Sequence, residues 1–94
     1  MQKIQLKSVP RRSENIRWRE FGTDGILLDP RSGDYFQVDD VGITIWKRMD
    51  GRKTVEKIVE ELSSDFCSEE ADMVKDTIEF MERLVGEGLI SVEP

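Results

Sequence analysis

The sequence contains no histidine and a single cysteine, Cys67, among its 94 residues. Histidine is the usual general base and the commonest metal ligand, and zinc sites, iron–sulfur clusters and redox pairs need several cysteines or histidines. One cysteine also forms no disulfide within the chain, and Cys67 follows Phe66 without a basic neighbour, which is typical of a structural thiol. We therefore expect no catalytic residue, no metal ion and no cofactor.

Long apolar segments are missing as well. No stretch approaches the roughly 18 apolar residues that a membrane-spanning helix needs. The start of the chain, MQKIQLKSVPRR, has no apolar segment typical of a secretory signal. These absences predict a cytoplasmic protein without a membrane partner.

Basic residues are scarce beyond the start of the chain. Residues 1–20 hold six Lys or Arg and two acids, whereas residues 21–94 hold eight Lys or Arg and eighteen acids. Because contacts between basic side chains and phosphates supply most nucleic-acid affinity, this acidic body argues against a nucleic-acid partner.

Apolar residues, at 37% of the chain, are numerous enough for one small core, and the length allows one domain rather than two. Residues 1–15 mix charged residues, serine and Pro10 without a period. We expect a flexible basic N-terminal arm over residues 1–15 and a single domain over residues 16–94.

Three short segments predict an antiparallel sheet. In residues 16–21 the apolar side chains of Ile16 and Trp18 alternate with arginines, which is the period of a half-buried strand. Residues 26–28 and 35–38 form the next two strands, and segments rich in Gly, Asp and Pro separate the three. Trp18 and Trp46 are predicted to anchor the core.

The spacing of apolar residues changes to that of helices after Asp39 and Asp40, which are suited to cap a helix that ends near Gly51. Thr54 is the expected cap of a second helix over residues 55–66, and Ser68 begins a third that ends near Gly86. The tail, residues 89–92, either adds a strand or docks on the core. The predicted fold class is α+β, winged-helix-like, with a three-stranded antiparallel sheet followed by three helices.

Winged helices usually bind DNA, but residues 68–86 hold six acids against Lys75 and Arg83, which argues against that function. The apolar arc of this third helix covers about half its circumference, whereas one core face needs only about 100°. The arc consists of two stripes: Ala71, Val74, Ile78, Met81 and Val85, and beside them Met73, Thr77, Phe80 and Leu84. Either the helix packs against two neighbours or part of the arc lines a groove for a partner.

The third strand, residues 35–38, carries no Pro, Lys or Arg that would discourage a further strand from pairing with it. An edge of this kind is able to receive an extended peptide. Because the strand is short, its exposed edge is also compatible with no function at all.

The stretch LLDPRSGDYFQVDDVGITIWKRMDGRKTVEKIVEEL, residues 27–62, resembles the PqqD-like family. Its members run from a Leu-Leu-Asp strand through a Gly-containing turn and a Tyr-aromatic strand to a Gly-x-x-Ile-Trp helix and an Asp-Gly-x-x-Thr-Val motif. FMERLVGEGLI, residues 80–90, is similar to the closing helix of the family. The family is also known as the RiPP recognition element.

The resemblance implies a non-catalytic peptide-binding chaperone in natural-product biosynthesis. Such a protein captures the leader of a ribosomally synthesised precursor peptide by strand addition. It presents the precursor to a separate maturation enzyme, which is a protease, a radical enzyme or another modifying enzyme. A general protein-interaction or subunit domain without leader specificity is the alternative, and an enzyme ranks third.

The resemblance also implies the binding residues. The third strand supplies the pairing edge and the third helix the opposite wall, while the stripe of Met73 and Phe80 stays open as the alternative wall. Where many relatives have Leu-Asn, this chain has Val38-Asp39, which adds a negative charge near the end of the groove. The implied peptide-binding residues are Tyr35, Phe36, Gln37, Val38, Val74, Thr77, Ile78 and Met81.

Overall fold

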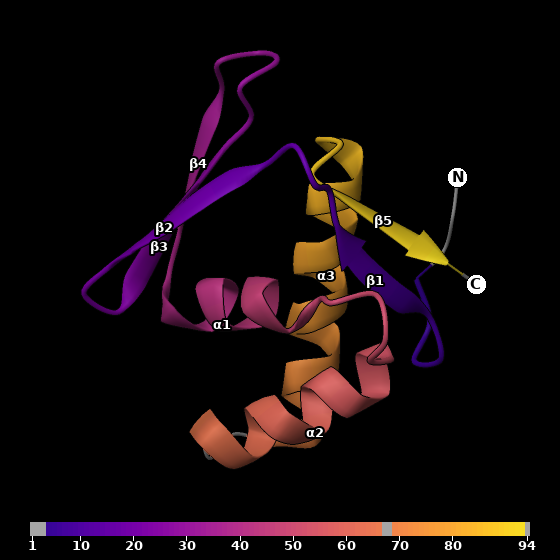
Figure 1. Cartoon of the computed structure of the whole chain (residues 1–94). Helices are drawn as coiled ribbons and strands as arrows, with labels where there is room; N and C mark the ends of the chain where they lie inside the picture. Colours follow the sequence, from indigo (N-terminus) through magenta and orange to yellow (C-terminus); the bar gives the residue numbers. More distant parts are fainter. Residues whose placement is uncertain (1–3, 67–68, 94) are drawn as a thin grey trace.

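The computed structural model describes residues 4–66 and 69–93, which form two small sheets and three helices (Figure 1). The three-stranded sheet lies at the upper left in Figure 1, above α1, whereas the two-stranded sheet lies beside α3 on the right. The elements in chain order are β1 (Val9–Arg12), β2 (Arg17–Phe21), β3 (Asp24–Leu28), β4 (Tyr35–Val38), α1 (Asp40–Arg48), α2 (Val55–Phe66), α3 (Glu70–Gly86) and β5 (Ile90–Glu93).

The three-stranded sheet has the order β2-β3-β4, and both pairs are antiparallel. Gly22 has a φ of 59°, in the two-residue turn between β2 and β3, where a positive φ favours glycine. The carboxylate of Asp29 accepts hydrogen bonds from the backbone N–H and the side chain of Arg31, which orders the turn before β4. The predicted fold, three antiparallel strands followed by three helices, is confirmed.

Helix α1 begins as the sequence predicts. The side chain of Asp39 accepts a hydrogen bond from the backbone N–H of Gly42 at 2.8 Å and so caps the helix. A Cβ atom on Gly25 would lie 2.5 Å from the Cδ1 atom of Ile43, so α1 packs directly against the backbone of β3. Trp46 is fully buried, and its predicted place in the core is confirmed.

Helix α2 is held to α1 by charge as well as by the core. The hydroxyl of Thr54 accepts from the N–H of Lys57 at 3.2 Å, as expected of its cap. Glu61 accepts hydrogen bonds from Arg48 and from Lys53, the latter at 2.9 Å. The Lys53 ammonium, followed by the Arg48 guanidinium, lowers the pKa of Glu61 from its usual value.

The expectation of a flexible arm over residues 1–15 is wrong for the described part of that segment. Strand β1 pairs with β5 in antiparallel register, and Ile4 and Pro10 are buried. The carbonyls of Ser8 and Leu6 accept the N–H groups of Val55 and Glu56, at 2.9 Å each. The segment is ordered because it gives β5 a partner and the first turn of α2 acceptors that the helix itself lacks.

Trp18 does not anchor the core, in contrast to the prediction, because 41% of it is exposed. It pairs with Leu27 across the sheet and so points to the same face as that buried residue. However, β2 is the outer strand, and α1 packs over β3. The guanidinium of Arg12 lies 5.8 Å from the centre of the Trp18 ring and covers it in part.

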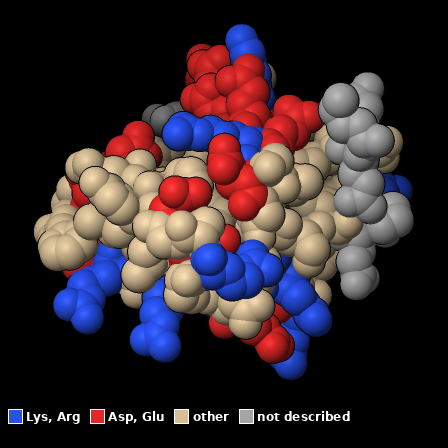
Figure 2. Space-filling view, turned by 90° about the horizontal axis from the view of Figure 1, so that it is seen from above, with Lys and Arg blue, Asp and Glu red and all other residues tan. Residues whose placement is uncertain are grey.

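Charged side chains are unevenly distributed over the surface. On the face shown in Figure 2, most acidic side chains gather toward the top, with a few basic ones among them, most basic side chains follow the lower border, and uncharged side chains lie between. None of the described helices is both long and apolar enough to cross a membrane. The expectations for Cys67 and for a helix start at Ser68 lie outside the described residues.

Candidate functional site

Strand β4 has a neighbour on one side only. It pairs with β3, and β5, the other strand that follows it in the chain, pairs with β1 instead. Within residues 4–66 and 69–93, nothing therefore pairs with the second edge of β4. That edge is open to a further strand.

The register identifies which backbone groups face this open edge. Just beyond the ladder, the N–H of Asp29 donates a hydrogen bond of 2.9 Å to the carbonyl of Asp34, so these two residues form a bonded pair. Because bonded and non-bonded pairs alternate along an antiparallel ladder, Phe36 and Val38 direct their backbone groups toward β3. The N–H and C=O groups of Tyr35 and Gln37 consequently point to the open edge.

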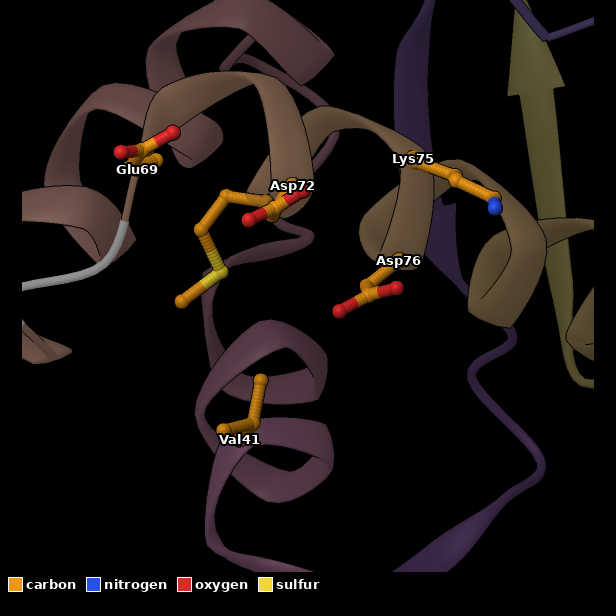
Figure 3. Close-up of a pocket in the computed structure, with 6 residues that line it drawn as sticks. Val41, Glu69, Asp72, Lys75 and Asp76 are labelled. Carbon is orange, nitrogen blue, oxygen red and sulfur yellow. The ribbon is translucent and has the colours of Figure 1, made fainter.

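Two adjoining hollows lie between α1 and α3. The first, of about 260 Å³, is mostly apolar, and the second, of about 560 Å³, is mostly polar. They share Val41 and Asp76, so they form one trough, whose second half is shown in Figure 3. The first hollow is lined by Asp39, Val41, Gly42, Ile45, Asp76 and Phe80, and the second by Val41, Glu69, Asp72, Met73, Lys75 and Asp76.

Gly42 joins this trough to the open edge. A Cβ atom on Gly42 would lie 3.1 Å from the Cβ atom of Val38 and 3.4 Å from the Cζ atom of Phe80. A glycine here lets the end of β4, the start of α1 and the middle of α3 approach closely. The trough therefore begins where β4 ends.

The predicted residues of β4 lie on the open edge strand. Tyr35 is 71% exposed and Gln37 is also exposed, whereas Phe36 is half-buried and Val38 is buried. The strand and its edge are as predicted, and contact of these four residues with a peptide stays a prediction.

The predicted wall residues of α3 divide into two groups. Thr77 and Met81 are fully buried, so their placement on an exposed wall is wrong. Val74 and Ile78 are half-buried, but at about 100° per residue they lie on the flank of the buried strip opposite Phe80. They line neither hollow.

Met73 and Phe80 line the trough, so the stripe that the sequence left open as the alternative is the one that faces α1. The residues that α1 contributes to the trough, Val41, Gly42 and Ile45, were not predicted from the sequence. Gly42 is the one indication in the sequence that this helix takes part in the site. Glycine weakens a helix, so its presence near the start of α1 indicates a close approach of another element.

The trough is acidic. Four carboxylates, from Asp39, Glu69, Asp72 and Asp76, line it together with one ammonium group, from Lys75. In Figure 3, the Lys75 side chain extends away from the Asp76 carboxylate. None of the four carboxylates forms an ion pair with another described residue.

The arrangement is suited to binding. An open strand edge offers backbone donors and acceptors, and the adjoining trough offers apolar and acidic surfaces to side chains. In the described part of the chain, no group of three or more acidic or cysteine side chains is placed to hold a metal ion.

Solved structures of other proteins share the fold, and two of them are complexes with a leader peptide. TbiB1 in complex with the TbiA(beta) leader peptide is 23% identical, with a TM-score of 0.78 over 86% of this chain and 94% of that chain. Lasso peptide synthetase B1 complexed with the leader peptide is 24% identical, with a TM-score of 0.76 over 92% of this chain and 99% of that chain.

The third structure is the solution NMR structure of the PqqD truncation of Methylobacterium extorquens PqqCD. It is described as a functional and stand-alone RiPP recognition element. It is 24% identical to this chain, with a TM-score of 0.79 over 94% of both chains.

A comparison with curated proteins finds no match. The model of the family described as coenzyme PQQ synthesis protein D (PqqD) matches residues 24–90. The match runs from the start of β3 to the first residue of β5 and so contains β4, α1 and α3, which together form the site. This chain belongs to the PqqD family.

Proposed function

We propose that this chain binds the leader region of a ribosomally synthesised precursor peptide and presents that precursor to a separate maturation enzyme. The leader adds a strand to the open edge of β4 and places side chains in the trough between α1 and α3. The chain itself performs no chemistry on the peptide.

The single observation that carries this proposal is the open edge of β4 beside the trough. Tyr35 and Gln37 direct backbone donors and acceptors to an edge that no described strand occupies. Unpaired strand edges invite a further strand, and natural proteins usually block them with Pro, Lys or a bulge. Strand β4, Tyr35–Val38, contains neither Pro nor Lys.

The comparisons support the same function. The chain belongs to the PqqD family, and two of the similar structures are complexes with leader peptides. The third is described as a stand-alone recognition element, which supports a binding role without catalysis.

A general protein-docking role is the second candidate, and one observation favours it. Phe21, Leu28 and Tyr35 are exposed on the face of the three-stranded sheet that points away from Leu27. Apolar side chains gathered on one face are typical of interaction surfaces. In this second role, the face would bind another protein or subunit without any leader peptide.

Proline substitution at Gln37 tests strand addition. A displayed library of random peptides is selected on the immobilised protein, and the best peptide is then synthesised and titrated. We expect Gln37→Pro to weaken its binding by roughly tenfold or more, because proline removes an N–H group that faces the open edge. Gln37→Ala keeps that N–H group and is expected to bind as the wild type does.

Circular dichroism provides the folding control for both variants. Phe36→Pro is expected to disturb the sheet itself, because the N–H of Phe36 points toward β3. If Gln37→Pro remains folded and binds the peptide as tightly as Gln37→Ala does, strand addition at this edge is wrong. Failure to enrich any peptide on the wild type would contradict the proposed function as a whole.

A further inference from the structure

We infer that the trough selects leader segments in which a Lys or Arg lies within a few residues of an apolar anchor. This inference rests on the proposed function, because it names the class of peptide that the same site accepts. Three features of the trough support it: its two halves differ in polarity, none of its carboxylates forms an ion pair with a described residue, and it continues the open edge of β4.

The half next to β4 takes the apolar anchor. Phe80 and Ile45 line it, and Gly42 leaves room between the end of β4 and α3. A side chain that enters this hollow exchanges water for apolar contacts. A peptide paired with the β4 edge reaches this hollow first, because the hollow begins beside Val38 and Asp39.

The other half takes the cation. Its charged lining consists of Glu69, Asp72, Asp76 and Lys75, and Figure 3 shows the Lys75 ammonium pointing away from the Asp76 carboxylate. The net lining is therefore negative, and a basic side chain would meet carboxylates that have no described partner. A leader segment rich in acids would instead meet like charges.

Two of these carboxylates also stabilise the helix on which they lie. Glu69 and Asp72 lie at the N-terminus of α3, where negative charge complements the helix dipole. Asp76 lies beyond the first turn of α3 and makes no ion pair with a described residue. It also lines both hollows, at the point where the apolar half meets the acidic half. Asp76 is accordingly the residue on which the inference is tested.

The test compares the peptides selected by two charge-reversed variants. From the same displayed library, wild type is expected to enrich peptides with Lys or Arg near an apolar residue. Asp76→Lys is expected to lose this preference and to bind the best wild-type peptide roughly fivefold more weakly. Glu82→Lys makes the same charge change at an exposed position about 120° around α3 from Asp76, outside the trough, and is expected to keep both the preference and the affinity.

A second measurement checks the electrostatic origin of the preference. Higher salt should weaken the best peptide's binding to wild type more than to Asp76→Lys. If wild type enriches peptides that lack basic residues, the inference is wrong while the proposed function stands. If Asp76→Lys and Glu82→Lys reduce the affinity equally, the effect is one of net charge and the inference is also wrong.

Discussion

Thr77 brings a hydroxyl group into the core without a described hydrogen-bond partner. The residue lies in the middle of α3 and is fully buried, and its Oγ1 atom has no partner in the structure. A buried hydroxyl that lacks a hydrogen bond costs free energy relative to a methyl group of the same shape. The core of this small domain is therefore not at its optimum.

Thr77→Val is expected to stabilise the protein. Valine keeps the branched shape and replaces the unpaired hydroxyl with a methyl group, so the free energy of unfolding should rise by about 1 kcal/mol. Thermal melting followed by circular dichroism should show an increase of roughly 4–8 °C. A lower melting temperature would mean that the hydroxyl has a partner in solution. Thr77→Asp, in contrast, places a charge in the core and should unfold the protein.

Phe80 and Leu84 lie on the same helix, but Phe80 lines the trough and Leu84 lies in the core. Leu84 is 2% exposed, so Leu84→Ala should cost about 2–5 kcal/mol of the free energy of unfolding. Phe80 is half-buried and lines the trough. Phe80→Ala should therefore lower the free energy of unfolding less than Leu84→Ala does, and weaken peptide binding more. The measurements are thermal melting and titration with the selected peptide. The assignment of Phe80 to the trough fails if its variant loses stability as Leu84→Ala does and the peptide still binds.

The sequence predicts the edge of the site better than its wall, and the reason lies in these side chains. The residues of β4 are neighbours in the chain, so their local pattern suffices. The apolar arc of α3 has two flanks beside one buried strip, and periodicity alone does not show which flank meets α1. Which flank faces α1 depends on the close approach of Gly42 to Phe80, and these two residues are 38 positions apart in the chain.

Strand β1 is an element that local sequence does not reveal. Pro10 is unfavourable in a strand because it has no backbone N–H, and β1 pairs with a segment about 80 residues away. The backbone of β1 and of the residues before it also completes other elements. The carbonyl of Pro10 accepts the N–H of Gly51 at 3.0 Å, and Ser8 and Leu6 accept the first N–H groups of α2.

Deletion of residues 1–12 is expected to destabilise the protein strongly. It exposes β5, removes Ile4 from the core and leaves N–H groups at the start of α2 without their acceptors. Circular dichroism should show a much lower melting temperature or an unfolded chain. Lys7→Ala, at an exposed position of the same segment, should leave the melting temperature unchanged. A deletion variant as stable as wild type would restore the interpretation of this segment as a loose arm.

Across the whole molecule, carboxylates stabilised by nearby donors link the fold to pH. The pKa of Asp29 is lowered by hydrogen bonds from the Arg31 side chain and backbone, and that of Asp50 by the backbone N–H groups of Lys53 and Arg52. A third lowered pKa, that of Glu61 in α2, is caused first by the Lys53 ammonium in the loop before α2 and then by the Arg48 guanidinium of α1. Because all three shifts have the same sign, their effects on stability add in the same direction as the pH changes.

The sign follows from linkage. A carboxyl with a lower pKa in the folded state than in the unfolded state stabilises the fold above the unfolded value, and this stabilisation disappears as the pH falls through the folded value. We therefore expect the melting temperature to be nearly constant from about pH 7 to pH 5 and to fall below that range. Glu61→Gln should lower the melting temperature near neutral pH, because Arg48 and Lys53 lose a charged partner.

The difference in melting temperature between wild type and Glu61→Gln should then shrink as the pH falls, because a protonated Glu61 is uncharged, as glutamine is. Glu60→Gln is the matched control: Glu60 lies next to Glu61 in the chain, and its contact with Lys57, 3.9 Å long, is exposed, so this variant should melt close to wild type at every pH. A difference for Glu61→Gln that stays constant down to low pH would show that the substitution acts on packing. In that case charge would not be what joins α1 to α2 at this position.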